Sequence, residues 1–403
     1  MEFLSSRDAN IQITEDVVEA AAGNWSSGKQ VMEFLFSRDA NIQITKETVK
    51  IIAKTWDQKM MEFLFSRDAN IQITKDVVKA AAGNSYSGKQ VMEFLFSRDA
   101  NIQITQDVVK AAAGNLDSGK QVIEFLFSRD ANIQITEDVV KAAARNWRSG
   151  KQVMEFLFSR DANIQITEDV VKAAAGNRYS GKQVIEFLFS RDTNIQITED
   201  VVKAAAGNLD SGKQVMEFLY SRDANIQITQ DVVKAAAGNR YSGKQVMEFL
   251  FSRDANIQIT QDVVKVAAGN RGSGKEVMEF LFSRDANIQI TKETIKIIAR
   301  TWDQKMMEFL FSRDASIQIT QDVVKAAAGN RGSGTQMMEL LFSYDANIQI
   351  TEDVVKAAAT SGQNPVLKLL KQYIPVDLSL EQISEHRYTS LHGMDTYVLF
   401  NAF

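Results

Sequence analysis

Three residues match the pattern of a phosphate-binding loop: Gly176, Gly181 and Lys182, with four residues between the glycines. In such a loop, backbone N–H groups surround the phosphates, the lysine reaches them, and a following Ser or Thr binds magnesium. Here the following residue is Gln183, and the segment comes after an alanine-rich helical pattern instead of a strand. The same text recurs in most repeats of the chain, for example at Gly83–Lys89. We interpret it as the end of one helix and the start of the next, and not as an ATP site.

Other catalytic groups are scarce. The chain has no cysteine, and its two histidines are His386 and His392. Cysteine nucleophiles, histidine acid–base catalysis and thiolate or imidazole metal sites are therefore excluded from the first 360 residues. Paired acids such as Glu168 and Asp169 lie where the first turn of a helix is predicted, and the helix dipole accounts for them. Glu168 also stands four residues before Lys172, which predicts an ion pair within that helix. We expect no catalytic residue, no cofactor, no metal and no enzymatic activity.

The composition of the chain bears on whether it binds nucleic acid or a membrane. The 403 residues include 46 basic and 51 acidic side chains, for a net charge of −5, which opposes binding to a phosphate backbone. The apolar share of 45% is ample for a packed core. The sequence shows no secretory signal and no apolar stretch of membrane-spanning length. We expect a cytoplasmic protein that binds neither nucleic acid nor a membrane.

An internal repeat dominates the sequence. The motif MEFLFSRDANIQIT and its close variants recur twelve times, 31 residues apart except for two spacings of 29. We call residues 32–60 and 278–306 the two short repeats; both contain the text Thr-Trp-Asp-Gln. The copies begin at Met1, Met32, Met61, Met92, Ile123, Met154, Ile185, Met216, Met247, Met278, Met307 and Met338.

The repeats define the expected domain organisation. Tandem helix-pair repeats are predicted over residues 1–360, and the first is truncated because Met1 aligns with the interior of a repeat, as in a fragment. Residues 361–386 are predicted to form a degenerate repeat that caps the stack, since terminal repeats lack a neighbour on one side. Residues 387–403 fit no repeat, and the sequence predicts no structure for them.

Each repeat predicts two short helices. In the copy from Ser87 onwards, the first helix runs to about Arg98 and carries a wide apolar face. A capping box is expected between Ser87 and Gln90. The second helix follows Thr105 as its N-cap and is expected to end at Gly114 in a left-handed conformation. One apolar side of such a pair stays uncovered until it stacks on the next pair. The predicted fold is therefore all-α, an α-solenoid of about twelve ankyrin-like helix-pair repeats.

The text SGKQVMEFLFSRDANIQIT resembles the outer helix and loop of an ankyrin repeat, although the period is 31 instead of 33 and the Thr-Pro-Leu-His tetrapeptide is absent. Residues 1 to about 360, and Gln165–Asn177 in particular, are closer to repeat tracts of the form ITEEVVKAAAGN that filamentous fungi carry behind NACHT-type nucleotide-binding domains. This resemblance implies the C-terminal sensor arm of a NOD-like receptor in non-self recognition. It also implies a nucleotide-binding domain upstream of this chain.

The copies differ mainly in the turn between the second helix of one repeat and the first helix of the next, and at the first residue of the second helix. The turn positions are rich in Trp, Tyr and Arg, the residue types that anchor protein interfaces. We therefore predict that a protein partner binds at Trp25, Trp56, Tyr86, Leu116, Asp117, Trp147, Arg148, Arg178, Tyr179, Leu209, Asp210, Arg240, Tyr241, Arg271, Trp302 and Arg331.

Three alternatives to this prediction remain at the level of the sequence. Turns tolerate substitution, so the variation is also consistent with neutral change. A passive scaffold or spacer would keep its function if all turns were made identical. Modular nucleic-acid binding, with one base per repeat, fits the form of the variable pairs, but the net charge opposes it.

Overall fold

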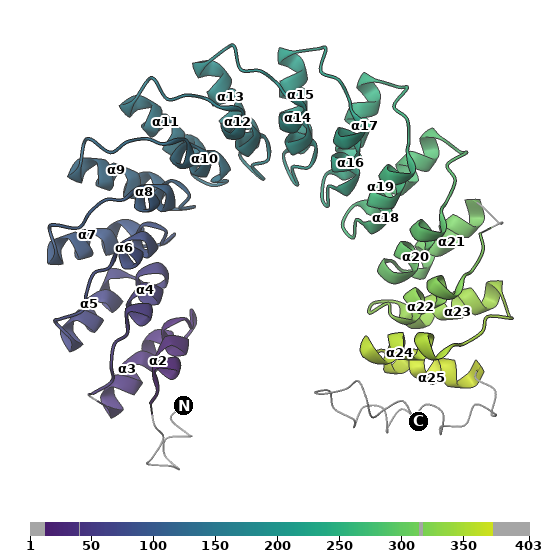
Figure 1. Ribbon diagram of the computed structural model, residues 1–403, viewed down its shortest axis with the longest axis horizontal. Coiled ribbons are helices and arrows are strands. Elements are labelled where there is room, and N and C mark those ends of the chain that lie inside the picture. The colour runs from purple at the N-terminus through teal and green to yellow at the C-terminus, as the bar shows by residue number, and fades with distance from the viewer. Residues whose placement is uncertain (1–12, 40, 314–316, 374–403) are drawn as a thin grey trace. The chain divides into compact units, whose positions relative to one another are not determined.

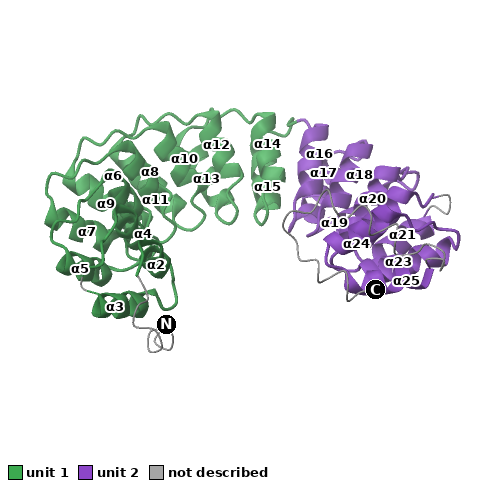
Figure 2. Cartoon of the chain, turned by 60° about the horizontal axis from the view of Figure 1, so that its bottom comes forward, with its two compact units in different colours: residues 1–226 green, residues 227–403 purple. Residues whose placement is uncertain are grey.

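The computed structural model describes residues 13–39, 41–313 and 317–373. These residues form 24 helices and no strand, which confirms the predicted all-α class. The chain divides into two compact units, residues 1–226 and 227–403 (Figure 2). Each unit is a solenoid of helix pairs in which the even-numbered helices form one layer, the B layer, and the odd-numbered helices form the other, the A layer (Figure 1).

The helices of unit 1 have the following bounds. Its B layer consists of α2 Glu15–Ala22, α4 Lys46–Thr55, α6 Lys75–Ala82, α8 Gln106–Ala113, α10 Glu137–Arg145, α12 Glu168–Ala175 and α14 Glu199–Ala206. Its A layer consists of α3 Gly28–Arg38, α5 Gln58–Arg67, α7 Gly88–Arg98, α9 Gly119–Arg129, α11 Gly150–Arg160, α13 Gly181–Arg191 and α15 Gly212–Arg222.

Unit 2 continues the same order. Its B layer consists of α16 Gln230–Gly238, α18 Gln261–Gly269, α20 Lys292–Thr301, α22 Gln321–Ala328 and α24 Glu352–Thr360. Its A layer consists of α17 Gly243–Arg253, α19 Gly274–Arg284, α21 Gln304–Arg313, α23 Gly334–Tyr344 and α25 Asn364–Tyr373.

The core lies between the two layers. In α8, Val108 and Ala112 are fully buried, and the small alanines let successive B-layer helices approach closely. In α7 the buried residues cover more than one face, as predicted, because that helix contacts the B layer and both A-layer neighbours. The rings of Phe96 and of Phe125 in the next repeat form an edge-to-face contact, with their centroids 5.5 Å apart. The guanidinium of Arg129 lies over both rings.

Two predicted helix ends are wrong. Ser87 makes no side-chain capping bond; instead the Asn84 side-chain oxygen accepts the backbone N–H of Ser87 at 3.0 Å. Gly114 has φ −82°, so it is right-handed. The reason is that the N–H of Asn115 bonds back to the Ala112 carbonyl at 3.1 Å, which continues the right-handed turn. Helix α8 does begin directly after Thr105, as predicted.

The predicted ends of the repeat tract are only partly described. The segment 361–386 contains helix α25, whose Val366, Leu367 and Leu370 are buried against the preceding repeat. Residues 374–386, the tail 387–403 and the truncated start at residues 1–12 lie outside the described residues. Among the helices that the structure describes, none combines the length and the apolar character that crossing a membrane requires.

Candidate partner-binding surface

Each regular turn between the B layer and the A layer is built around one asparagine, which is buried in the described turns except at Asn24. The Nδ2 of Asn208 donates to the carbonyl oxygens of Ala175 at 2.8 Å and Asn177 at 2.6 Å, both in the preceding repeat. Its Oδ1 accepts the backbone N–H of Ser211 at 3.1 Å. The Ser211 hydroxyl donates to the Asn177 carbonyl at 3.2 Å. Because these bonds run from repeat to repeat, they fix each turn against its neighbour.

We call the two residues after each turn asparagine the turn row. The backbone N–H of the second member donates to the asparagine Oδ1, as at Tyr86 (3.1 Å) and Tyr241 (3.2 Å). The described members of the turn row are Trp25–Ser26, Ser85–Tyr86, Leu116–Asp117, Trp147–Arg148, Arg178–Tyr179 and Leu209–Asp210 in unit 1, and Arg240–Tyr241, Arg271–Gly272 and Arg331–Gly332 in unit 2.

The structure places several aromatic members of the turn row in solvent. The side chains of Trp25, Tyr86, Tyr179 and Tyr241 are 64%, 70%, 50% and 57% exposed. In unit 1 the first member of a pair is often half-buried, as are Leu116, Trp147, Arg178 and Leu209, while the second is exposed. In unit 2, Arg240, Arg271 and Arg331 are exposed first members.

Neighbouring turns in unit 1 contact one another through these side chains. The rings of Trp147 and Tyr179 lie 5.1 Å apart, edge to face. Arg148 donates to Asp117 at 2.5 Å, and this hydrogen bond raises the pKa of the Arg148 guanidinium. Arg178 pairs in the same way with Asp210. Within unit 1, these contacts link neighbouring turns, and the charges of Asp117, Arg148, Arg178 and Asp210 are paired.

Ten segments of the chain match the model of a family described as a domain of unknown function (DUF7104). They are residues 3–32, 63–92, 94–122, 125–154, 156–184, 187–216, 218–247, 249–278, 309–338 and 340–364, which together make up well over half of the sequence. The chain belongs to the DUF7104 family. A comparison with curated proteins found no match.

The DUF7104 matches omit residues 33–62 and 279–308, which contain nearly all of the two short repeats. In these repeats tryptophan replaces the asparagine of the turn. The indole N–H of Trp56 donates to the Ala22 carbonyl at 2.6 Å, and that of Trp302 donates to the Ala268 carbonyl at 2.6 Å. Asp57 then caps α5 by accepting the N–H of Met60 at 3.1 Å.

The two short-repeat tryptophans therefore differ from the exposed aromatic residues with which the sequence grouped them. Both are half-buried, and their indole N–H groups are occupied by the preceding repeat. Their position within Thr-Trp-Asp-Gln, in a turn two residues shorter than the others, was the available signal for a packing role. Their participation in partner binding stays a prediction.

The second variable set, at the first residue of each B-layer helix, contacts the next repeat. Gln106 donates to the Gln134 carbonyl at 3.1 Å and accepts the Thr136 hydroxyl at 3.2 Å. Where this residue is Glu137, it accepts the Thr167 hydroxyl at 2.8 Å. This variable set thus contributes to the stacking of DUF7104 repeats.

Sequence reasoning missed a ladder of ion pairs along the B layer. The predicted ion pair between Lys172 and Glu168 of the same helix is wrong. The Lys172 ammonium pairs instead with the Asp200 carboxylate of the next repeat, at 3.0 Å. Asp200 also accepts Lys203 at 2.7 Å. These two lysines, Lys203 first, lower the pKa of Asp200 to about 2. The lysine and the aspartate that recur in most of the DUF7104 repeats were the available signal. Which lysine pairs with which aspartate depends on how the repeats stack.

Proposed function

We propose that this DUF7104 chain is a non-catalytic scaffold that binds a protein partner through the turn row. The observation that carries the proposal is the exposure of Tyr86, Tyr179 and Tyr241 on turns whose backbone is fixed by buried asparagines. Trp25 is exposed as well, on a turn in which the exposed Asn24 accepts the backbone N–H of Ser27 at 3.2 Å. Because the repeats are otherwise nearly identical, these turn residues account for much of the difference between the surface of one repeat and that of another.

Physical arguments support a binding role for such a strip. Large aromatic side chains contribute much contact area while losing little conformational entropy, because they have only two rotatable bonds. A turn that is already rigid adds little ordering cost on association. Repeat proteins also present long surfaces from which several repeats contact one partner at once.

The biological setting belongs to the same proposal. The resemblance of Gln165–Asn177 to fungal tracts behind NACHT-type domains supports a role as the recognition arm of a NOD-like receptor-type protein. Such a protein would act in the cytoplasm, in non-self recognition. The alternative is a passive spacer, in which the turn row has no partner.

Photo-crosslinking tests the proposal. A photoreactive phenylalanine derivative placed at Tyr179 of the full chain is expected to crosslink to a protein in cells that produce the chain. The same derivative at Glu186, an exposed A-layer residue, is the control and is expected to give no such product.

A matched exchange identifies the origin of the crosslink. The double variant Arg178→Leu, Tyr179→Asp copies the pair at Leu209–Asp210, which this fold already accommodates. With the photoreactive group moved to Tyr86, the double variant is expected to reduce the crosslink and leave far-UV circular dichroism unchanged. A crosslink that survives this and several further exchanges would support the passive spacer instead.

A further inference from the structure

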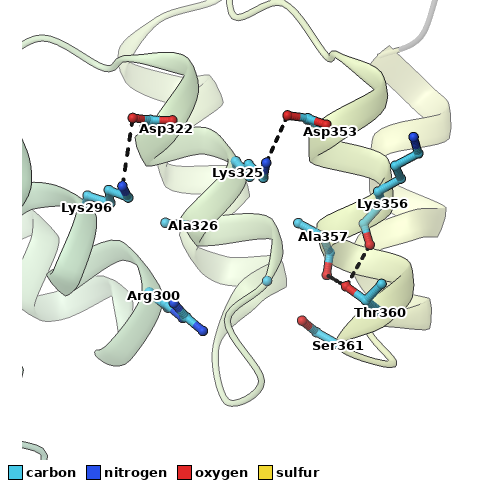
Figure 3. Close-up of a pocket in the computed structure, with 11 residues that line it drawn as sticks. Lys296, Arg300, Asp322, Lys325, Ala326, Asp353, Lys356, Ala357, Thr360 and Ser361 are labelled. Atoms are coloured by element: carbon cyan, nitrogen blue, oxygen red, sulfur yellow. Dashed lines mark hydrogen bonds and ion pairs between the residues drawn. The ribbon is translucent and has the colours of Figure 1, made fainter.

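An open groove lies over the second short repeat, within unit 2. It has a volume of about 660 Å³ and is lined by Arg271, Arg300, Trp302, Asp303, Arg331 and Gly332, among others. It adjoins a second hollow of about 470 Å³ on the B layer, with which it shares Arg300 and Ser361 (Figure 3). Both volumes lie in the range of pockets that accommodate small ligands or a few side chains.

The groove exists because of the short repeat and the small residues beside it. The turn at Trp302 is two residues shorter than a regular turn. Across the first short repeat, the corresponding space is bridged by Trp25 and Tyr86, whose rings meet edge to face with their centroids 5.9 Å apart. In the second copy these two positions hold Arg271 and Gly332, so no such bridge forms.

The groove carries an excess of positive charge. Within the part of the chain that the structure describes, the guanidinium groups of Arg271, Arg300 and Arg331 form no ion pair with a carboxylate. Arg148 and Arg178, at comparable turn positions of unit 1, do form such pairs. Within the described residues, these three guanidinium groups therefore present charge to the groove that no ion pair offsets.

The carboxylates near the groove do not neutralise these arginines. Asp322 pairs with Lys296 at 3.9 Å and Asp353 pairs with Lys325 at 2.9 Å, and Figure 3 shows Arg300 directed away from both. Asp303 accepts the backbone N–H of Met306 at 3.2 Å. The half-buried ring of Trp302 adds an apolar surface beside the guanidinium groups.

We propose that this groove binds an acidic peptide segment of the protein partner, with side-chain carboxylates paired to Arg271, Arg300 and Arg331. A guanidinium presents two parallel N–H donors that match the two oxygens of a carboxylate. The inference rests on the proposed function, because it names a class of ligand for the same scaffold. A peptide is favoured over nucleic acid because the net charge of −5 opposes binding to a continuous phosphate backbone, whereas a short peptide presents only a few negative charges.

A defined peptide tests the site on the full chain. The probe is fluorescein-labelled Gly-Glu-Asp-Glu-Leu-Gly, followed by fluorescence anisotropy, and the comparison peptide carries Gln and Asn in place of the acids. We expect only the acidic peptide to bind, and added sodium chloride to weaken it. Arg300→Gln with Arg331→Gln is expected to weaken binding by about tenfold or more, since charge-assisted bonds are lost. Arg148→Gln with Arg178→Gln in unit 1 is the control and should leave binding unchanged.

A second variant tests the shape of the groove. Arg271→Trp with Gly332→Tyr rebuilds the aromatic pair of the first short repeat, and a Cβ at Gly332 has only one neighbouring atom, at 3.8 Å. We expect this variant to keep its helicity and to lose the peptide. Absence of peptide binding, or equal losses in the unit 1 control, would overturn the inference.

A single-stranded oligonucleotide of equal charge is the competing probe. If it bound more tightly than the peptide at the same salt concentration and lost affinity in the arginine variants, the site would be a nucleic-acid site and the inference would be wrong. Failure of the peptide with an intact crosslink from the turn row would remove this inference and leave the proposed function standing. If the crosslink were unchanged by the turn-row exchanges while the peptide still bound, the turn-row proposal alone would be wrong.

Discussion

The two short repeats share the same buried contacts, but the turns on either side of them carry different residues. In both, the indole N–H of the tryptophan bonds to the last alanine of a preceding B-layer helix at 2.6 Å, at Ala22 and at Ala268. In regular repeats an asparagine donates to the corresponding carbonyl oxygen; the Nδ2 of Asn115, for example, donates to the Ala82 carbonyl at 2.9 Å. The interior of the repeat therefore maintains the stacking whichever residue supplies the donor.

The difference lies in the turns on either side. Trp25 and Tyr86 cover the first short repeat, whereas Arg271 and Gly332 leave the second open. The second short repeat has Arg271, Arg331 and Gly332 where the first has Trp25, Ser85 and Tyr86, so a charged groove stands in place of an aromatic contact. In this fold the buried residues determine how repeats stack, and the turn residues determine what each stretch of surface can bind.

The largest expected effect tests whether the two tryptophans are equivalent. Trp56→Ala and Trp302→Ala should each lower the free energy of unfolding by about 3 kcal/mol, because a large side chain and a hydrogen bond to a backbone carbonyl are both lost. Urea unfolding followed by circular dichroism, with hydrogen exchange to locate the opened repeats, measures this. Trp25→Ala, which removes an exposed ring, is the control with little effect. A much smaller loss at Trp302 than at Trp56 would break the equivalence.

The next largest change in stability is expected at a glycine that packs against Trp302. A Cβ at Gly274 would lie 2.3 Å from the Ala267 carbonyl oxygen and 2.8 Å from Cζ2 of Trp302. Gly274→Ala should therefore destabilise the protein by about 2 kcal/mol, since backbone and ring must both shift. The nearby Gly269 has no atom within 4 Å of its added Cβ.

Gly269→Ala is the matched control, and it should stabilise the chain by about 0.5 kcal/mol because alanine is the better helix former. Melting temperatures of the two variants should move in opposite directions. Equal shifts would show that close approach at the short repeat does not determine the choice of glycine.

The sequence predicted the features that depend on local pattern. The bounds of α7 and α8, the N-cap position Thr105 and the buried faces all follow from helical periodicity within one repeat. The predicted conformations at the two helix ends were wrong because the turn asparagines, Asn84 and Asn115, determine them. These asparagines are themselves held by carbonyl groups of the preceding repeat. The Ser118 hydroxyl, for example, bonds to the Asn84 carbonyl 34 residues away, and no short-range rule contains that distance.

The candidate site was predicted to a similar degree. Exposure of Tyr86 and Tyr179 agrees with the expectation for a variable turn. The groove was not predicted, because Arg148 and Arg271 look alike in the sequence. Only the stacked structure shows that Asp117 lies beside Arg148 and that no carboxylate of the described residues forms an ion pair with Arg271.

The smallest expected effect compares the ion pairs of regular and short repeats. Asp200 forms ion pairs with Lys172 and Lys203, and its pKa is lowered to about 2. Among the described residues, Asp322 forms one ion pair, with Lys296 of the short repeat at 3.9 Å. A lowered carboxyl pKa stabilises the folded state above the unfolded value, about 3.9 for aspartate, and this contribution is lost as the pH falls towards about 2.

Asp200→Asn should therefore lower the urea midpoint at pH 6, and the difference from the unchanged protein should shrink between about pH 4 and pH 2. Asp322→Asn should give a smaller difference at pH 6, because its single ion pair is long and exposed to solvent. Added salt should reduce both differences, since these pairs lie at the surface. If the Asp200→Asn difference stayed constant down to pH 2, the ladder would not contribute to stacking, and the regular and short repeats would differ only in their turns.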